Sequence, residues 1–303
     1  MTQNIRQSPF STKSLTPLSY DNPMAYYLIL MQFFLALIAL FLFWKSIEYF
    51  VGMWRYKKFK TMPLPQNYRE TLLSLPHYLD LPGDLREKIR TRILLFIDQK
   101  EFVSAQMEIT EEIKVIIAFY ASLVRLGFEL DEHDKVATII VYPEDFVVDR
   151  SSTHNGIHTN RSSLLSGESA NRTVVLSWQD IRHHIVSGSK ENVIIHEFAH
   201  ELDFEDGMPD GTPELDTFSA YPRYAQVFSN AFIILTKQVK RNLITEQAAF
   251  LGSYALENEA EFFAVCSERF FMAPHTLKRV LPDIYEELHR FYRLDTALMF
   301  KAP

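Results

Sequence analysis

The longest apolar run of the chain lies near its N-terminus. Residues 24–44 form a stretch of 21 positions without a charged side chain, in which Gln32 is the one strongly polar residue. As a helix rising about 1.5 Å per residue, this stretch spans roughly 31 Å, the thickness of the hydrocarbon core of a bilayer. No small-residue cleavage site follows the run, which argues against a secretory signal peptide. The pattern therefore predicts a single transmembrane helix over residues 24–44, preceded by an N-terminal tail of residues 1–23.

Positive charges flank this predicted span unevenly. Arg6 and Lys13 precede it, with Asp21 against them, whereas a larger group of cations follows it: Lys45, Arg55, Lys57, Lys58 and Lys60. Loops that remain in the cytoplasm carry an excess of Lys and Arg. We therefore expect an inner-membrane (cytoplasmic membrane) protein whose C-terminal part faces the cytoplasm, with residues 45–65 as a basic juxtamembrane linker.

Beyond residue 65 the hydrophobic pattern alternates between helical and strand periods. Two β-branched runs, Val136–Tyr142 and Arg172–Trp178, predict strands. Apolar positions at helical spacing predict helices over Asp84–Gln99, Thr110–Leu126, and near residues 222–241, 256–272 and 282–294. The order of helices, a small sheet and further helices predicts an α+β fold, predominantly helical, in one domain over residues 66–303.

The composition narrows the classes of function. A net charge of -7 disfavours non-specific nucleic-acid binding, and we expect no nucleic-acid partner. The single cysteine, Cys266, excludes an intrachain disulfide and a cysteine-rich zinc module. The sequence contains neither a phosphate-binding glycine loop nor a dinucleotide fingerprint.

The clearest chemistry lies in the stretch VIIHEFAHELDFEDG, residues 193–207. Residues four apart share one face of a helix, so His196 and His200 can bind the same ion. Glu197 lies about 100° around the helix, where it can reach a water molecule on that ion and act as general base. Zinc lowers the pKa of such a water toward 7, and the glutamate takes its proton as the water attacks a carbonyl. We expect Ser189 to cap this helix and Gly207 to follow its end.

A third protein ligand is required, and spacing alone leaves three sources open. Asp206 stands at the metzincin position, but Asp203 occupies the place of the glycine that the metzincin turn needs. Asp203 itself suits a carboxylate that orients a ligand histidine, or a solvated acid in the last turn. The third source is the stretch Ser253–Phe271, with glutamates at 257, 259 and 261. Glu259 shares a face with Phe262, Phe263 and Cys266, so we expect it to be buried, whereas Glu261 and Glu257 share a narrower face with small residues.

Several segments of the chain, taken in order, resemble the Mlc titration factor A family of zinc peptidases. They are IVYPEDFVV, LLSGES, RTVVLSW, NVIIHEFAHELD and AEFFAVCSERFF, and the resemblance runs from roughly residue 72 to 295. It implies a gluzincin, a zincin-like catalytic domain similar to that of anthrax lethal factor, with one zinc ion per chain. It also implies His196, His200 and Glu261 as zinc ligands and Glu197 as the catalytic base.

The resemblance further points to Tyr254 as a catalytic residue, whose hydroxyl would stabilise the oxyanion of a tetrahedral intermediate. By analogy, the TVVLSW strand would be an edge strand that pairs with an extended peptide substrate. In this family a glucose-responsive transcription repressor is a binding partner, so a transcription regulator is a second expected partner. The chain departs from the family by its N-terminal anchor and by Glu201, where a lysine is usual.

The leading hypothesis is a membrane-anchored zinc metallopeptidase that faces the cytoplasm. The alternative is a membrane-tethered protein that binds a regulator and keeps a structural or vestigial zinc site. Glu197 favours catalysis, because a structural site needs no base and is usually closed by a fourth protein ligand. We interpret the remaining histidines of the central region as surface or structural residues: His154, His158, His183 and His184.

Overall fold

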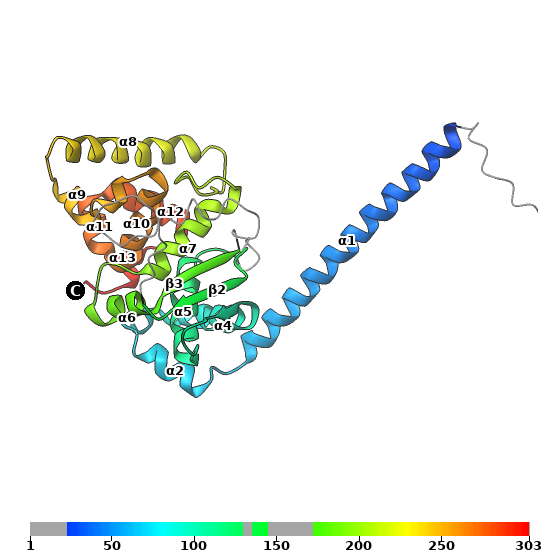
Figure 1. Cartoon of the computed structure of the whole chain (residues 1–303), viewed down its shortest axis with the longest axis horizontal. Coiled ribbons are helices and arrows are strands. Elements are labelled where there is room, and N and C mark those ends of the chain that lie inside the picture. Colours follow the sequence, from blue (N-terminus) through cyan, green and yellow to red (C-terminus); the bar gives the residue numbers. More distant parts are fainter. Residues whose placement is uncertain (1–22, 130–134, 145–171, 303) are drawn as a thin grey trace, which may run out of the picture. The chain divides into compact units, whose positions relative to one another are not determined.

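The computed structural model of the chain describes residues 23–129, 135–144 and 172–302, and separates into two units, Met1–Lys57 and Lys58–Pro303. The first unit consists of most of helix α1, Pro23–Thr61, drawn in blue in Figure 1. By length and composition α1 is a candidate for crossing a membrane, and none of its most apolar window is buried. The helix does not stop at Trp44, so the basic stretch after the predicted span is helical as far as Thr61.

The second unit is predominantly helical with a small sheet, which confirms the predicted fold class (Figure 1). Its α-helices before the candidate site are α2 (Gln66–Leu73), α3 (Pro76–Asp80), α4 (Gly83–Gln99), α5 (Glu111–Val124) and α6 (Trp178–Ser187). The remaining ones are α7 (Val193–Asp203), α8 (Tyr221–Lys240), α9 (Glu246–Leu251), α10 (Glu259–Met272), α11 (Pro274–Val280), α12 (Pro282–Tyr292) and α13 (Thr296–Met299). Two short 3₁₀ helices, η2 (Phe204–Asp206) and η3 (Tyr254–Leu256), follow α7 and precede α10.

The described strands form one parallel sheet in the order β1-β2-β3. Strand β1 is Glu101–Val103, β2 is Thr138–Tyr142 and β3 is Thr173–Ser177. Thr138 of β2 pairs with Glu101 on one side and with Thr173 on the other. Strand β3, which comes from the TVVLSW segment, is therefore an outer strand among those that the structure describes.

Helix α5 occupies the centre of the hydrophobic core. Every residue from Val115 to Val124 is buried, on all sides of the helix. A helix that is apolar all round must be covered by neighbouring elements, and α5 is packed by α2, α4 and α7. The helix that carries the two histidines thus rests on a helix that is buried on all sides.

Some elements differ from the pattern-based expectation for local reasons. The second predicted strand ends at Ser177 rather than Trp178, because the Ser177 side chain accepts a hydrogen bond from Asp180 N and starts α6. The helix expected over residues 256–272 is interrupted. Asn258 caps a fresh start at Glu259, so η3 and α10 are separate elements.

Candidate metal centre

Helix α7 positions both histidines of the motif. It begins at Val193 because the side chain of Asn192 accepts hydrogen bonds from Ile194 N and Ile195 N, at 3.1 and 3.2 Å. The expectation that Ser189 would be the cap is wrong: its hydroxyl accepts a bond from Glu191 N within the preceding turn. The apolar side of α7 is buried through Ile194, Ile195, Phe198, Ala199 and Leu202. This packing fixes the rotation of α7 about its axis. It therefore also fixes the direction in which His196 and His200 point.

Helix α10 supplies the third side chain. Asn258 accepts a hydrogen bond from Glu261 N at 2.9 Å, which places Glu261 in the first turn of the helix. Glu261 is buried, whereas Glu259 and Glu257 are exposed. The expectation that Glu259 would be buried is therefore wrong, because the helix starts at that residue and its side chain leaves the apolar face. Of the glutamates left open by spacing, Glu261 is the one that reaches α7.

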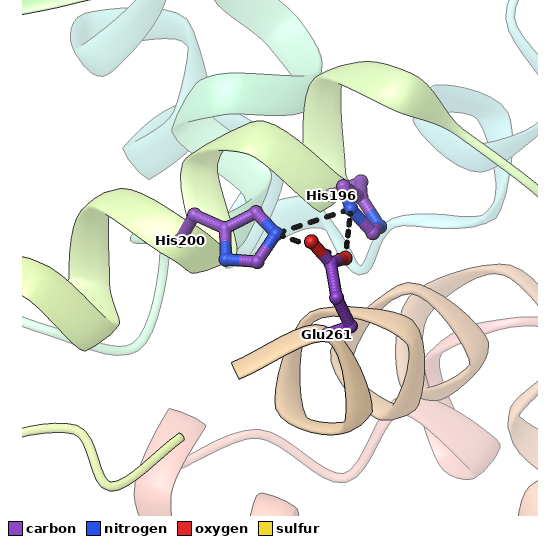
Figure 2. A group of neighbouring side chains, drawn as sticks. All are labelled: His196, His200 and Glu261. Atoms are coloured by element: carbon purple, nitrogen blue, oxygen red, sulfur yellow. Dashed lines mark hydrogen bonds and ion pairs between the residues drawn. The ribbon is translucent and has the colours of Figure 1, made fainter. Parts of the chain in front are cut away.

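His196, His200 and Glu261 converge at one point (Figure 2). The Nε2 atom of His196 lies 3.2 Å from Nε2 of His200 and 3.2 Å from Oε2 of Glu261. The distance from His200 Nε2 to the same carboxylate oxygen is 3.3 Å. These two nitrogens and one oxygen, the candidate metal ligands, therefore form a nearly equilateral triangle. The side chain of His200 is 25% exposed, against 12% for His196, so the triangle opens to solvent on the His200 side.

The size of this triangle fits a tetrahedral metal ion. Zinc binds imidazole nitrogen and carboxylate oxygen at about 2.0–2.2 Å, and the edges of such a tetrahedron are about 3.3–3.6 Å long. The observed separations are 3.2, 3.2 and 3.3 Å. Two imidazole nitrogens that face each other at this distance need a cation or a proton between them. Within the described residues, this is the group of His, Cys, Asp and Glu side chains that could hold a metal.

The charges of the triangle are strongly coupled. Burial lowers the pKa of His196, but the carboxylates of Glu261 and Glu268 outweigh it and raise the pKa to about 10. Burial raises the pKa of Glu261, but the two imidazoles outweigh this effect and hold its pKa below the usual range. The site thus stabilises one positive charge beside a carboxylate, which is the electrostatic setting that a bound cation uses.

Glu197 and Tyr254 lie at the edge of this group. Glu197 is partly buried, and its charge contributes to raising the pKa of both His196 and Tyr254. The ring of Tyr254, on η3, lies 5.8 Å from the ring of His196. Burial raises the pKa of Tyr254, and the adjacent Glu261 carboxylate raises it further. The phenol therefore remains a proton donor at neutral pH, as an oxyanion-stabilising hydroxyl requires.

Asp203 is fully buried and therefore is not a solvated acid. Its Oδ2 atom accepts a hydrogen bond from Gly211 N at 2.9 Å. Gly211 has φ +81°, and a Cβ atom placed on it would lie 2.3 Å from the carbonyl oxygen of Glu259. Its own carbonyl accepts a bond from the buried Tyr224 hydroxyl of α8. Asp203 therefore links the end of α7 to the start of α10. The side chain of Asp206, the metzincin alternative, lies outside the described part of the chain.

A charged pair that the sequence analysis did not single out stands behind His196. Glu268 and Arg269 of α10 are 5% and 3% exposed. Glu268 Oε2 lies 3.9 Å from Nδ1 of His196 and 3.1 Å from Nη1 of Arg269. The signal was present in the segment FFAVCSERFF, because two charges inside an apolar helix must find partners.

The other histidines of the central region lie away from the triangle or outside the described residues. His154 and His158 belong to the segment that the structure does not describe. His183 lines a pocket of about 500 Å³ on α6, together with Trp178 and Arg182. His184 is partly buried, and burial lowers its pKa. Neither His196, His200 nor Glu261 lines this pocket.

The chain matches known proteins over most of its length. The family model described as glucose-regulated metallo-peptidase M90 matches residues 51–293. An uncharacterised protein of Synechocystis is 32% identical over 248 residues, covering 80% of this chain and 89% of the relative. The Mlc titration factor A of Pectobacterium atrosepticum is 30% identical over 239 residues, 77% of this chain and 88% of that protein. The Mlc titration factor A of Escherichia coli is 31% identical over 232 residues, 74% of this chain and 84% of that protein.

Proposed function

The chain belongs to the glucose-regulated metallo-peptidase M90 family, and we propose that it is a membrane-anchored zinc peptidase that hydrolyses peptide bonds in the cytoplasm. The observation that carries the proposal is the triangle of His196, His200 and Glu261, whose edges of 3.2–3.3 Å match those of a tetrahedral zinc site. Three protein ligands leave a fourth position open, which distinguishes catalytic from structural zinc sites.

Each residue of the site has its own role in the proposed reaction. His196, His200 and Glu261 would hold the ion, and zinc, when bound, lowers the pKa of water and polarises a carbonyl. Glu197 accepts the proton of the attacking water and passes it to the leaving amine. The Tyr254 hydroxyl donates a hydrogen bond to the oxygen that becomes negative in the transition state. The edge of β3 that no described strand covers offers backbone groups for pairing with an extended peptide.

The proposed arrangement of the chain follows from α1. Residues 24–44 would span the inner membrane once, with residues 1–23 outside the cytoplasm. The cations after the span would hold residues 45–65 and the peptidase domain, residues 66–303, on the cytoplasmic side. A C-terminal fluorescent-protein fusion should fluoresce, and a C-terminal alkaline phosphatase fusion should be inactive. The reverse pattern would overturn the orientation but not the peptidase assignment.

Zinc content and peptide hydrolysis test the catalytic proposal. The full chain in detergent should contain about one zinc ion, and His196→Ala should lose it. Glu197→Gln should keep zinc and lose cleavage of a peptide library. Glu201→Gln, one turn later on the same helix, is the matched control and should cleave at the parent rate. Undiminished cleavage by Glu197→Gln would refute the mechanism, and the library profile would identify the preferred substrates.

A second function is favoured by the names of the relatives. Mlc titration factor A denotes a protein that titrates a regulator, so this chain would bind a transcription regulator with its zinc site structural or vestigial. The two functions predict different results for the Glu197→Gln variant and the parent chain. A binding protein would keep its partner in Glu197→Gln and would show no peptide cleavage in the parent chain.

A further inference from the structure

Two buried charges on α10 are placed where they act on the metal centre. Glu268 and Arg269 keep 5% and 3% of their surface exposed, in a helix whose other buried positions are mostly apolar. Arg269 Nη1 donates to Glu268 Oε2 at 3.1 Å, so each charge has an opposite partner. Pairing explains how the two charges are tolerated. It does not explain why the carboxylate also reaches across to α7.

Glu268 makes its remaining contacts with the first turn of α7. Its Oε1 atom accepts a hydrogen bond from the backbone N–H of Asn192, the residue that caps the helix. Its Oε2 atom lies 3.9 Å from Nδ1 of His196, an ion-pair separation longer than a direct hydrogen bond. Nδ1 is the ring nitrogen on the side away from the triangle, since Nε2 faces Glu261 and His200. The carboxylate thus holds the start of the helix and stands behind its first histidine.

Arg269 fixes the carboxylate in turn. Its guanidinium donates to the carbonyl oxygens of Lys190, Leu251 and Phe250 at 2.8, 3.3 and 3.4 Å. These carbonyls belong to the segment before α7 and to the end of α9. A guanidinium with so many backbone acceptors has one orientation, so the Glu268 carboxylate beside it is also held in one place.

We propose that Glu268 is a positioning residue of the metal centre, which orients the imidazole of His196 from behind and is itself oriented by Arg269. A carboxylate at the second ring nitrogen of a histidine selects the tautomer that presents the other nitrogen to a metal, and it restricts the rotation of the ring. The inference rests on the proposed metal site. It adds a residue that acts on the metal only through His196.

A purely structural role would predict a different outcome, and the chain offers a matched control. Glu287 of α12 is 6% exposed and is paired with Arg223 at 2.6 Å and Arg290 at 3.0 Å. It is also a buried glutamate with arginine partners, but its described contacts are with these arginines rather than with a ligand histidine. Neutralising either glutamate removes a buried carboxylate from its arginine partner, although Arg269 keeps Glu191 and Arg290 keeps Glu286 as partners. Only the loss of Glu268 should change metal binding.

The experiment compares Glu268→Gln, Glu268→Asp and Glu287→Gln with the parent, each as the full chain in detergent. The zinc dissociation constant is measured by competition with a chelator, and the unfolding temperature is measured on the metal-free proteins. We expect Glu268→Gln to weaken zinc binding 10- to 100-fold, the usual effect of losing a carboxylate behind a ligand histidine. Glu268→Asp keeps the charge and should recover part of this affinity. Glu287→Gln should bind zinc as the parent does, whatever its unfolding temperature.

Two results would overturn the inference: parent-like zinc affinity in Glu268→Gln, or a loss of affinity in Glu287→Gln as large as that in Glu268→Gln. If Glu268→Gln does not fold, Glu268→Asp decides, since its shorter side chain draws the carboxylate away from His196. Parent-like affinity in Glu268→Asp would then count against the inference. The zinc content of the parent chain is a separate reading, because its absence would refute the proposed function and not merely the role of Glu268.

Discussion

Gly211→Ala perturbs the contact between the loop that Asp203 holds and the start of α10. Gly211 has φ +81°, and the added Cβ atom would lie 2.3 Å from the carbonyl oxygen and 2.6 Å from the carbonyl carbon of Glu259. A left-handed conformation costs a residue with a Cβ atom about 1–2 kcal/mol. Forcing an extra carbon into a packed site costs a further 1–3 kcal/mol, roughly. We therefore expect Gly211→Ala to lower the free energy of unfolding by about 2–5 kcal/mol.

Gly207→Ala separates the two contributions. Gly207 also has a positive φ, +93°, but a Cβ atom there would meet nothing within 4 Å. Both substitutions restrict the unfolded chain equally, so their difference isolates the steric contribution, about 1–3 kcal/mol. Thermal unfolding of the full chain in detergent gives the comparison, at roughly 2–4 °C per kcal/mol for a domain of 150–250 residues.

Zinc affinity provides the second measurement on the same two variants, Gly211→Ala and Gly207→Ala. The clash falls on Glu259, two residues before the proposed ligand Glu261, so Gly211→Ala should displace the first turn of α10 and weaken zinc binding. Gly207→Ala should leave zinc binding unchanged. Equal unfolding temperatures for the two variants, together with equal zinc affinities, would refute the reasoning that Gly211 fixes the distance between α7 and α10.

Three further predictions concern single side chains. Tyr254→Phe should lower kcat about 100-fold, the usual effect of losing one oxyanion donor, with zinc affinity unchanged; an unaltered kcat in peptide hydrolysis would contradict the proposed role. Phe198→Ala should cost about 3–5 kcal/mol in denaturant unfolding, because Phe198 is 2% exposed and packs against Phe96 beneath the histidines. His77→Asn should reduce the loss of unfolding free energy that occurs as the pH falls. Burial lowers the pKa of His77 to about 4, so the unfolded state takes up a proton first as the pH falls, and up to about 3 kcal/mol is lost between pH 6.5 and 4. An equally steep loss in His77→Asn would assign the effect to other groups.

The parts of the site that depend on local spacing could be predicted from the sequence. His196 and His200 share a helix face by the period of the helix alone, and α7 forms as expected. The choice of Glu261 over Glu259 could not be made from periodicity, because it depends on where α10 begins. Asn258 followed by Glu261 three positions later is the cap signal that marks this start. Without the family resemblance, that signal would have been needed to choose the ligand.

The parts of the fold that the pattern missed are short or are determined by distant contacts. Strand β1 has three residues, too few for an alternating pattern to stand out. Helix α6 is largely polar and follows β3 without a loop, although Ser177 before Asp180 is a recognisable cap. The placement of Glu268 behind His196 depends on the packing of two helices separated by 55 residues (259 − 203 − 1), and no local rule contains that information.

The number of residues between His200 and Glu261 also determines how much later Glu261 is synthesised. Ribosomes add roughly 5–20 residues per second, so Glu261 is synthesised roughly 3–12 s after His200, from which it is 61 residues away (261 − 200). During that interval the nascent chain carries His196, Glu197 and His200 without Glu261, the third proposed ligand. If the proposed peptidase needs Glu261 to complete its metal site, it cannot cleave the unfinished chains around it before α10 docks. Under the proposed function, the order of residues thus delays peptide hydrolysis until the domain is nearly complete.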